Sequence, residues 1–446
     1  MKKVIIIGSG PAGYPAALKL KSMGADVKIV ENWSFGGTCL NRGCIPSKAI
    51  LEVAHRYHAI KEINDFFEGS FNIKPKWDKI KEHKNKVVNM LRSSLEKLFI
   101  MKKIQIIKGT ATITSSNKIE VENNGVKNEY EFDNLIIATG TKPAYPPPFN
   151  EFKQFLKDSD NIFDIEKQPN KLIIVGAGVI GVELACFFNA IGTDVSVIDI
   201  MPDILYFEDK SITRILKQSL EKRGVKFYLG KKTKEIKIND SKKTLILEDE
   251  TELTADEIMV AAGRIADLKN LNLEAAGIKY NKFIEVNEYM QTSNPNIYAV
   301  GDVNGISLLA HSATRQGEIA ALNIMGYKEI FDIKIVPNCI YTFPEIASVG
   351  LRPEEAKTKN INIKTKKAFF QVVGKAVATF STEGFIQILT DENDVILGAQ
   401  IVGGPATEII HILSIAIKFK MTTSQLNSII YAHPTMSEII MEALNK

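Results

Sequence analysis

Hydrophobic residues follow two successive patterns at the start of the chain. A run of β-branched residues, Val4–Ile7, comes before a glycine-rich turn, and a helical segment then extends to about Met23. A second apolar run, Val27–Val30, completes a βαβ unit. The same order returns later, where apolar runs at 172–175 and 195–198 flank another glycine-rich turn and helix. The chain therefore contains an internal duplication.

The two βαβ units keep the same spacing between equivalent residues. Gly8 and Gly176, which open the glycine turns, are 168 residues apart, and so are Glu31 and Asp199, which close the units. Each unit is also followed by an apolar strand that runs into a turn of small residues, at 135–140 and 258–264. We therefore predict two similar nucleotide-binding domains of the Rossmann-like α/β class.

Other segments indicate where these domains end. A long helix is predicted over 77–100, with its apolar stripe formed by Ile80, Val87, Leu91, Leu95 and Leu98. The segment 143–148 carries four prolines, which predicts a stiff connector. From about residue 335 the pattern changes to short alternating strands, and helices follow from about residue 407. This arrangement is typical of a third domain of the α+β class.

Composition excludes several classes of protein. The chain has 446 residues, of which 45% are hydrophobic and 24% charged, with a net charge of +4 from dispersed lysines and arginines. This balance gives no sign of nucleic-acid binding. No apolar run approaches the roughly 18 residues that span a bilayer, and no signal peptide is recognisable, so a cytoplasmic protein without membrane attachment is expected. With only four cysteines, a disulfide would more typically be catalytic than structural.

The glycine turns carry the signature of dinucleotide binding. In such turns the first glycine makes the bend, the second lets the backbone approach a pyrophosphate, and the third lets the helix pack on the strand. The first turn ends in a helix and is followed by Glu31, whose carboxylate suits ribose hydroxyls. Its candidate binding residues are Gly8, Gly10, Pro11, Ala12 and Gly13. Pro15 removes a hydrogen bond near the start of this helix, and the sequence offers no functional reason for it.

The second turn has the same features, and the acidic residue that follows it indicates which nucleotide it binds. Its candidate residues are Gly176, Gly178, Val179, Ile180 and Gly181. Asp199 ends the unit, and no arginine follows before Arg214. A carboxylate at this position would repel a 2′-phosphate, so we expect the second nucleotide to be NAD and not NADP.

Two cysteines five residues apart lie at the predicted start of a helix. Cys39 and Cys44 belong to the string GGTCLNRGCIPSK, which also holds Gly37, Thr38 and Lys48. A helix N-terminus favours a thiolate, so the pair suits redox chemistry. Two other interpretations stay open at this point: two inert buried thiols, or a zinc site completed by His55 and His58 on the following helix.

Together these segments resemble the flavin-dependent pyridine nucleotide–disulfide oxidoreductases. The resemblance covers the whole chain in order: flavin turn, cysteine pair, the Ala138–Gly140 turn, nicotinamide turn, the Ala299–Asp302 segment and the C-terminal AHPTMSE string at 432–438. It implies bound FAD and NAD, and a flavin domain formed from 1–142 and 267–334. The NAD-binding domain would then be 143–266, and a dimerisation domain 335–446.

The resemblance also assigns roles to single residues. Cys39 and Cys44 would form the redox-active disulfide, with Cys39 exchanging with substrate and Cys44 facing the flavin. Lys48 and Glu183 would pair beside the flavin ring. Further cofactor contacts are implied for Ala111, Thr139, Gly140, Ala262, Gly263, Arg264, Asp302 and Ala310. The remaining cysteines, Cys186 and Cys339, are expected to be packing residues.

His433 is the candidate general base. It stands in HPTMSE, where Pro434 fixes the turn and Glu438 can return to hold the imidazole. In the resembled family this segment completes the site of the other subunit, so a homodimer is expected.

The most similar branch of the family oxidises dihydrolipoamide with NAD⁺, and this activity is therefore expected here, without a metal ion. The lipoyl group would arrive on a protein domain of a multienzyme complex, such as a 2-oxo acid dehydrogenase or the glycine cleavage system. Glutathione and mercuric reductases are alternatives within the family. A glutathione reductase needs cations after the second βαβ strand, and a mercuric reductase carries another cysteine pair near its C-terminus, whereas this chain has neither. A non-catalytic flavoprotein or a zinc-binding module is the alternative from a different class.

Overall fold

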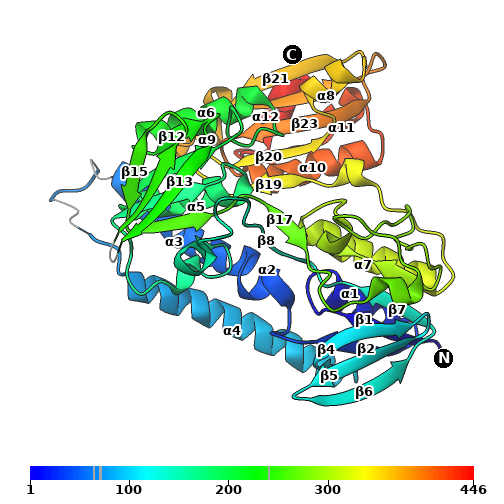
Figure 1. Ribbon diagram of the computed structural model, residues 1–446. Helices are drawn as coiled ribbons and strands as arrows, with labels where there is room; N and C mark the ends of the chain where they lie inside the picture. Colours follow the sequence, from blue (N-terminus) through cyan, green and yellow to red (C-terminus); the bar gives the residue numbers. More distant parts are fainter. Residues whose placement is uncertain (64–65, 70–72, 240–241) are drawn as a thin grey trace.

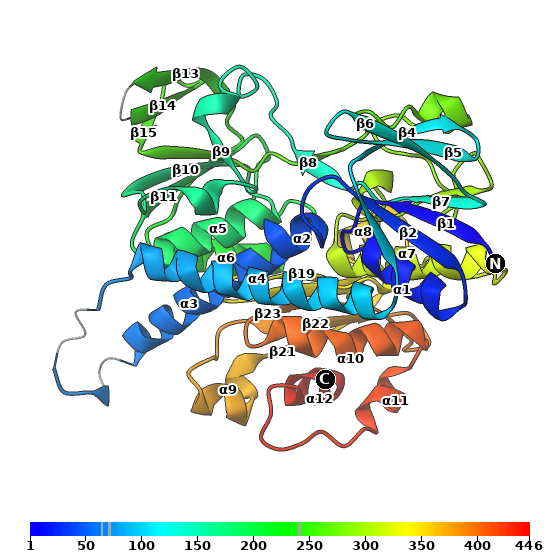
Figure 2. The same cartoon turned by 90° about the horizontal axis from the view of Figure 1, so that it is seen from below.

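Figure 1 shows a computed structural model of the protein. The structure describes residues 1–63, 66–69, 73–239 and 242–446. Two five-stranded parallel sheets and one five-stranded antiparallel sheet form the cores of three regions (Figures 1 and 2). Among the described residues, none of the helices combines the length and hydrophobicity needed to cross a bilayer.

The first parallel sheet contains the first βαβ unit. Its strand order is β18-β7-β1-β2-β3. The strands are β1 (Lys3–Ile7), β2 (Asp26–Glu31), β3 (Gln105–Lys108), β7 (Asn134–Ile137) and β18 (Ile297–Ala299). On one face of the sheet lie two helices, α1 (Gly13–Ser22) and α7 (Ala310–Ile324), which share an apolar cluster with it. On the other face packs a three-stranded antiparallel sheet of β4 (Thr110–Ser115), β5 (Lys118–Asn123) and β6 (Val126–Glu131).

The second parallel sheet repeats this architecture. Its order is β12-β11-β10-β16-β9. The strands are β9 (Lys157–Asp158), β10 (Lys171–Val175), β11 (Asp194–Asp199), β12 (Lys226–Leu229) and β16 (Glu257–Val260). Helices α5 (Val179–Ala190) and α6 (Lys210–Lys222) cover one face, and the antiparallel strands β13 (Thr233–Asn239), β14 (Lys242–Leu247) and β15 (Glu252–Ala255) cover the other. The duplication predicted from residue spacing is therefore present in three dimensions.

The C-terminal region is an antiparallel sheet with helices, as its alternating pattern predicts. The order is β19-β20-β23-β22-β21, formed by Asn338–Ile340, Ile346–Gly350, Ile396–Val402, Phe385–Thr390 and Lys364–Phe369 in that order. The helices are α8 (Pro353–Thr358), α9 (Gly374–Ala378), α10 (Ala406–Lys418), α11 (Thr423–Asn427) and α12 (Glu438–Leu444). Short 3-10 helices lie at Lys153–Phe155, Ile162–Asp164, Leu273–Ala276, Gly301–Asn304, Ile333–Ile335 and Phe370–Val372.

Helices from the N-terminal part of the chain join the two parallel-sheet regions. They are α2 (Gly37–Asn41), α3 (Cys44–Glu62) and α4 (Trp77–Met101). Figure 2 shows α4 running from one parallel-sheet region to the other. Trp77 at one end of α4 packs in the core of the second unit, and Phe99 near the other end packs in the core of the first. The predicted apolar stripe of α4 is wrong at Leu91, which is 37% exposed, because Val88 instead turns its side chain inward.

The proline-rich connector begins as a strand. The strands β8 (Thr141–Pro143) and β17 (Arg264–Ala266) pair in an antiparallel ribbon where the chain enters and leaves the second unit. Irregular backbone follows at 144–148, as the four prolines predict. Because β18 is in the first sheet, the chain returns to the first unit after completing the second.

Candidate active site

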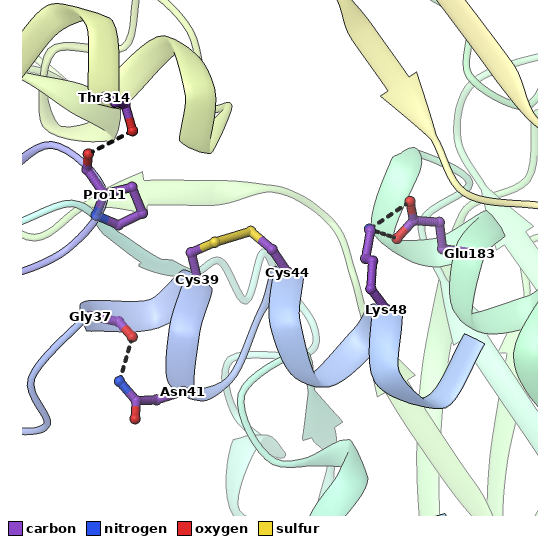
Figure 3. The surroundings of a disulfide bond; sticks show 8 residues. All are labelled: Pro11, Gly37, Cys39, Asn41, Cys44, Lys48, Glu183 and Thr314. Carbon is purple, nitrogen blue, oxygen red and sulfur yellow. Dashed lines mark hydrogen bonds and ion pairs between the residues drawn. A yellow bond between two sulfur atoms is a disulfide. The ribbon is translucent and has the colours of Figure 1, made fainter. Parts of the chain in front are cut away.

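A disulfide joins Cys39 in α2 to Cys44 at the first position of α3 (Figure 3). The intervening turn is held by its own backbone, since the amides of Arg42 and Gly43 both donate to the carbonyl of Thr38 at 2.8 Å. The cysteine pair is therefore a disulfide at the start of a helix, and the interpretation as two inert thiols is wrong.

The disulfide turn lies directly against the first glycine turn. Gly37 has φ of 62°, and a Cβ atom added there would lie 2.6 Å from the Cα of Gly10. The amide of Gly36 donates to the hydroxyl of Ser9 at 3.0 Å. Glycine at 37 is thus required both by its backbone conformation and by the close approach of another backbone. The redox pair and the candidate flavin turn form one structural unit.

The ammonium of Lys48 and the carboxylate of Glu183 form an ion pair beside the disulfide. Lys48 stands one helical turn after Cys44 in α3, and its Nζ lies 3.0 and 2.8 Å from the two carboxylate oxygens of Glu183 in α5 (Figure 3). The backbone amide of Tyr341 donates to the same carboxylate at 2.9 Å, and Nζ lies 4.3 Å from the centre of the Tyr341 ring. Burial raises the pKa of this tyrosine to about 12.

Both glycine turns have the same steric constraint. A Cβ atom at Gly8 would lie 2.3 Å from the carbonyl oxygen of Ala138, and one at Gly176 would lie 2.3 Å from that of Ala261. Their φ angles are 101° and 112°. Any larger residue would therefore force the strand and turn apart in either unit. The third glycine of each turn is constrained in the same way. A Cβ atom added at Gly13 would lie 1.9 Å from the carbonyl oxygen of Gly8, and one added at Gly181 would lie 1.9 Å from that of Gly176.

Acidic side chains close both turns as the spacing predicts. The carboxylate of Glu31 accepts from the amide and the hydroxyl of Ser9 at 3.0 and 2.6 Å and from the amide of Trp33 at 2.9 Å. That of Asp199 accepts from the amides of Ala177 at 2.5 Å and Met201 at 2.8 Å. Each carboxylate is thus fixed at the edge of its turn.

One cavity of about 2560 Å³ extends from the first glycine turn past the disulfide to the second glycine turn. It exceeds the roughly 300–1,000 Å³ of an ordinary ligand pocket, so it has room for more than one large ligand. Most of the predicted site residues line it: Gly8, Gly10, Pro11, Ala12, Glu31, Gly37, Thr38, Cys39, Cys44, Lys48, Ala111, Thr139, Gly140, Gly178, Val179, Ile180, Glu183, Gly263, Arg264, Asp302 and Ala310. The lining does not include Gly13, Gly176, Gly181, Asp199, Ala262, His433 or Glu438.

The cavity fits the cofactors that the sequence predicts. The hydroxyl of Thr139 is buried in its wall and has no hydrogen-bond partner among the described residues. Asp302 also lines the cavity, where it accepts from the hydroxyl of Thr141 at 2.9 Å, and burial raises the pKa of its carboxyl group. Both groups can bind hydroxyl or amide groups of a dinucleotide.

His433 and Glu438 meet as predicted but lie away from this cavity. The Nδ1 atom of His433 is 2.8 Å from a carboxylate oxygen of Glu438, whose other oxygen accepts from the amide of Thr435 at 2.8 Å. The hydrogen bond with His433 lowers the pKa of Glu438. The imidazole is 76% exposed on the C-terminal region and does not line the cavity that contains Cys39.

The zinc alternative receives no support from the described residues, among which no group of three or more His, Cys, Asp or Glu side chains could hold a metal ion. His55 and His58 instead stack on the ring of Phe343, with centroids 5.5 and 5.3 Å away.

The two remaining cysteines are free thiols. Cys186 is fully buried and Cys339 is half-buried, and burial raises the pKa of both thiols.

Sequence reasoning missed residues that brace the disulfide turn from other regions. The guanidinium of Arg42, between the two cysteines, lies 3.4 Å from the centre of the Trp33 ring and pairs with Asp160 of the second unit at 3.1 Å. Arg264, which the resemblance had already implied as a cofactor contact, lies 3.8 Å from the same Asp160 carboxylate and donates to the hydroxyl of Thr141 at 2.8 Å. Arg42 could have been found from its position between the two cysteines of the string. No local pattern marks Asp160, because its partner lies 118 residues away in the sequence.

Comparison with protein families decides the classification. Residues 2–317 match the model described as pyridine nucleotide-disulphide oxidoreductase, and residues 336–444 match the dimerisation domain of the same family. The chain belongs to the pyridine nucleotide-disulphide oxidoreductase family. The family and the fold class predicted from the sequence are confirmed.

Curated relatives agree over the full length. The chain is 35% identical to the dihydrolipoyl dehydrogenase of Geobacillus stearothermophilus over 99% of this chain and 95% of the relative. It is 37% identical to that of Thermus scotoductus over 99% of this chain and 96% of the relative. The protein is thus a flavoprotein disulfide oxidoreductase that uses FAD and NAD.

Solved structures show the same fold. LpdA from Mycobacterium tuberculosis has a TM-score of 0.93 at 23% identity, covering 100% of this chain and 99% of that one. The HOCl-induced flavoprotein disulfide reductase RclA from Escherichia coli has a TM-score of 0.88 at 26% identity, covering 99% of both chains.

Proposed function

We propose that the protein oxidises protein-bound dihydrolipoamide to lipoamide and reduces NAD⁺, through the disulfide of Cys39 and Cys44. The observation that carries this proposal is the position of the disulfide between the two glycine turns, with the Lys48–Glu183 pair beside it in the same cavity. Full-length similarity to dihydrolipoyl dehydrogenases supports the choice of substrate.

The cysteines would exchange the disulfide with the substrate. One thiolate of dihydrolipoamide attacks Sγ of Cys39, the bond to Cys44 breaks, and Cys44 leaves as a thiolate. The second substrate thiolate then attacks the substrate sulfur that is bonded to Cys39, which closes the lipoamide disulfide and releases Cys39 as a thiolate, so both cysteines are reduced. The substrate has lost two electrons and two protons.

FAD, when bound, would carry the two electrons from the cysteines to NAD⁺ as a hydride equivalent. We propose that the first turn, with Glu31, Thr139 and Asp302, holds FAD. The second turn, with Asp199, would hold NAD. Lys48 would place its positive charge beside the flavin ring, and Glu183 would fix the position of that charge.

The proton from the substrate thiol would go to His433 of the partner subunit. Within one chain the imidazole is held by Glu438 yet faces solvent, so a second copy must bring it to Cys39. Exposed apolar side chains precede it in the C-terminal region. They are Ile415 in α10, Phe419 directly after that helix, and Ile429 and Ile430, the last of which is 96% exposed. We therefore propose a homodimer through the matched dimerisation domain.

Mixing inactive subunits tests this arrangement. Cys39→Ser and His433→Gln homodimers should each be inactive toward dihydrolipoamide, whereas a mixed dimer should recover activity, because one of its two sites keeps both residues. Mixed dimers without recovered activity would place the base elsewhere.

Substrate preference tests the proposed reaction itself. Purified protein should oxidise dihydrolipoamide with NAD⁺ far faster than with NADP⁺, and should reduce lipoamide with NADH far faster than glutathione disulfide or mercuric ion with NADPH. The reverse order would favour a different disulfide reductase. We further propose that the natural substrate is the lipoyl domain of a cytoplasmic multienzyme complex.

A further inference from the structure

Pro15 leaves a gap in the hydrogen bonding of α1, at the start of the candidate flavin site. In a regular helix the amide of residue 15 donates to the carbonyl of residue 11, but proline has no amide hydrogen. The neighbouring bonds are present, since Tyr14 donates to Gly10 at 3.1 Å and Ala16 donates to Ala12 at 3.4 Å. The carbonyl of Pro11, just before α1, therefore lacks the amide donor that a regular first turn would supply.

A side chain from a distant part of the chain supplies the missing donor. The hydroxyl of Thr314 in α7 donates to the carbonyl oxygen of Pro11 at 3.0 Å (Figure 3). The two helices touch closely here, because a Cβ atom at Gly317 would lie 2.2 Å from the carbonyl oxygen of Ala12. Thr314 is 303 residues from Pro11, so the bond joins the first glycine turn to the segment that returns after the second unit.

The second βαβ unit shows the ordinary arrangement. With the constant spacing of 168 residues, Glu183 corresponds to Pro15 and Val179 corresponds to Pro11. Glu183 has an amide hydrogen and lies inside α5, so a helical bond to residue 179 is available. A distant donor is therefore needed in the first turn, whereas the second turn has a local one.

We infer that Thr314 is a positioning residue for FAD. A peptide unit is planar, with its C=O and N–H pointing in opposite directions, so holding the Pro11 carbonyl fixes the direction of the Ala12 N–H. Pro11 and Ala12 both line the cavity at the N-terminus of α1. Backbone N–H groups at a helix N-terminus are suited to bind a pyrophosphate. This inference rests on the proposal that the first turn binds FAD.

The rate of FAD release from diluted holoenzyme, followed by the rise in flavin fluorescence, tests the inference. Thr314→Val removes the hydroxyl at constant shape and should speed release about tenfold, whereas Thr314→Ser should stay within roughly twofold of wild type. Release from Thr314→Val within roughly twofold of wild type would overturn the inference, even if that variant melts at a lower temperature. Absence of bound FAD in the wild-type protein would instead overturn the proposed function.

A second variant pair makes the test specific for the Pro11 carbonyl. Pro15→Ala restores an amide donor, so adding Thr314→Val to it should change FAD release by less than roughly twofold. If Thr314→Val speeds release equally in both backgrounds, the hydroxyl acts through another contact and the inference is wrong. Should Thr314→Val alone fail to fold, the double variant is compared with Pro15→Ala: similar release supports the inference, and release about tenfold faster overturns it.

Discussion

Lys48 and Glu183 come from opposite halves of the internal duplication and meet at 2.8 Å beside the disulfide. The glutamate side chain is only 6% exposed and the lysine 33%. A charge buried to this degree needs its partner, because solvent no longer compensates for it. The pair therefore joins α3 to α5 as well as placing a positive charge at the site.

Glu183→Gln should destabilise the protein more than the loss of an exposed ion pair. It leaves Lys48 partly buried without its counter-charge, at a cost of about 1–3 kcal/mol. Glu52→Gln, in the same helix α3 as Lys48, removes the exposed partner of Arg56 and should lower the free energy of unfolding by less than about 0.5 kcal/mol. Urea unfolding followed by tryptophan fluorescence measures both. Equal effects would show that the pair contributes little to stability.

His433→Gln should separate the two halves of the reaction. Without a base, dihydrolipoamide oxidation should fall about 10²- to 10⁴-fold, while flavin reduction by NADH should stay near the wild-type rate. Stopped-flow absorbance measures each half. His83→Gln, on the exposed face of α4, serves as the control and should change neither. If both halves fall equally in His433→Gln, His433 is not the base.

Glu438→Gln should lower the rate of dihydrolipoamide oxidation. The Glu438 carboxylate lies 2.8 Å from Nδ1 of His433, and this hydrogen bond lowers the pKa of Glu438, so the carboxylate stays ionised below the usual pH range of a glutamate. A neutral amide is a weaker acceptor and holds the imidazole less firmly, so oxidation should fall about tenfold, while flavin reduction by NADH should stay near the wild-type rate. Stopped-flow absorbance measures both half-reactions. An unchanged rate of dihydrolipoamide oxidation would contradict the positioning role of Glu438.

Asp199→Ala should weaken NADH binding about 10- to 100-fold, because a charged hydrogen-bond acceptor is lost. It should also reduce discrimination against NADPH, since no carboxylate then repels the 2′-phosphate. Titration of flavin or nicotinamide fluorescence gives both affinities. Asp194→Ala at the other end of β11 removes an exposed partner of Lys226 and should leave both unchanged. An unaltered preference in Asp199→Ala would place nucleotide selection elsewhere.

Much of this site could be predicted because its residues lie in short local strings. The turns at Gly8 and Gly176 and the cysteine pair each combine a strand or helix start with a fixed spacing, and the structure brings them to one cavity. Glu31 and Asp199 likewise follow from their position at the end of a strand.

Contacts between distant segments could not be predicted from local patterns, and the Lys48–Glu183 pair was expected through the family resemblance. Asp160 with Arg42, Tyr341 with Glu183, and Thr314 with Pro11 all join residues more than 100 positions apart. Periodicity alone also misplaced Leu91, because the buried face of α4 follows its neighbours along two different cores. Local patterns likewise give no reason for Pro15, because the hydroxyl that replaces its missing amide donor comes from Thr314 in a distant helix.

The most direct test of the whole account is an anaerobic titration of the purified protein with dihydrolipoamide, followed by visible absorbance. The protein should be yellow at the start, and each addition should increase a long-wavelength band that arises when the Cys44 thiolate faces the flavin. NAD⁺ should then abolish the band and produce NADH in proportion. Cys44→Ser, which cannot form the disulfide, should show no band. A flavin spectrum that dihydrolipoamide leaves unchanged, while NADH produces the band, would contradict the proposed substrate.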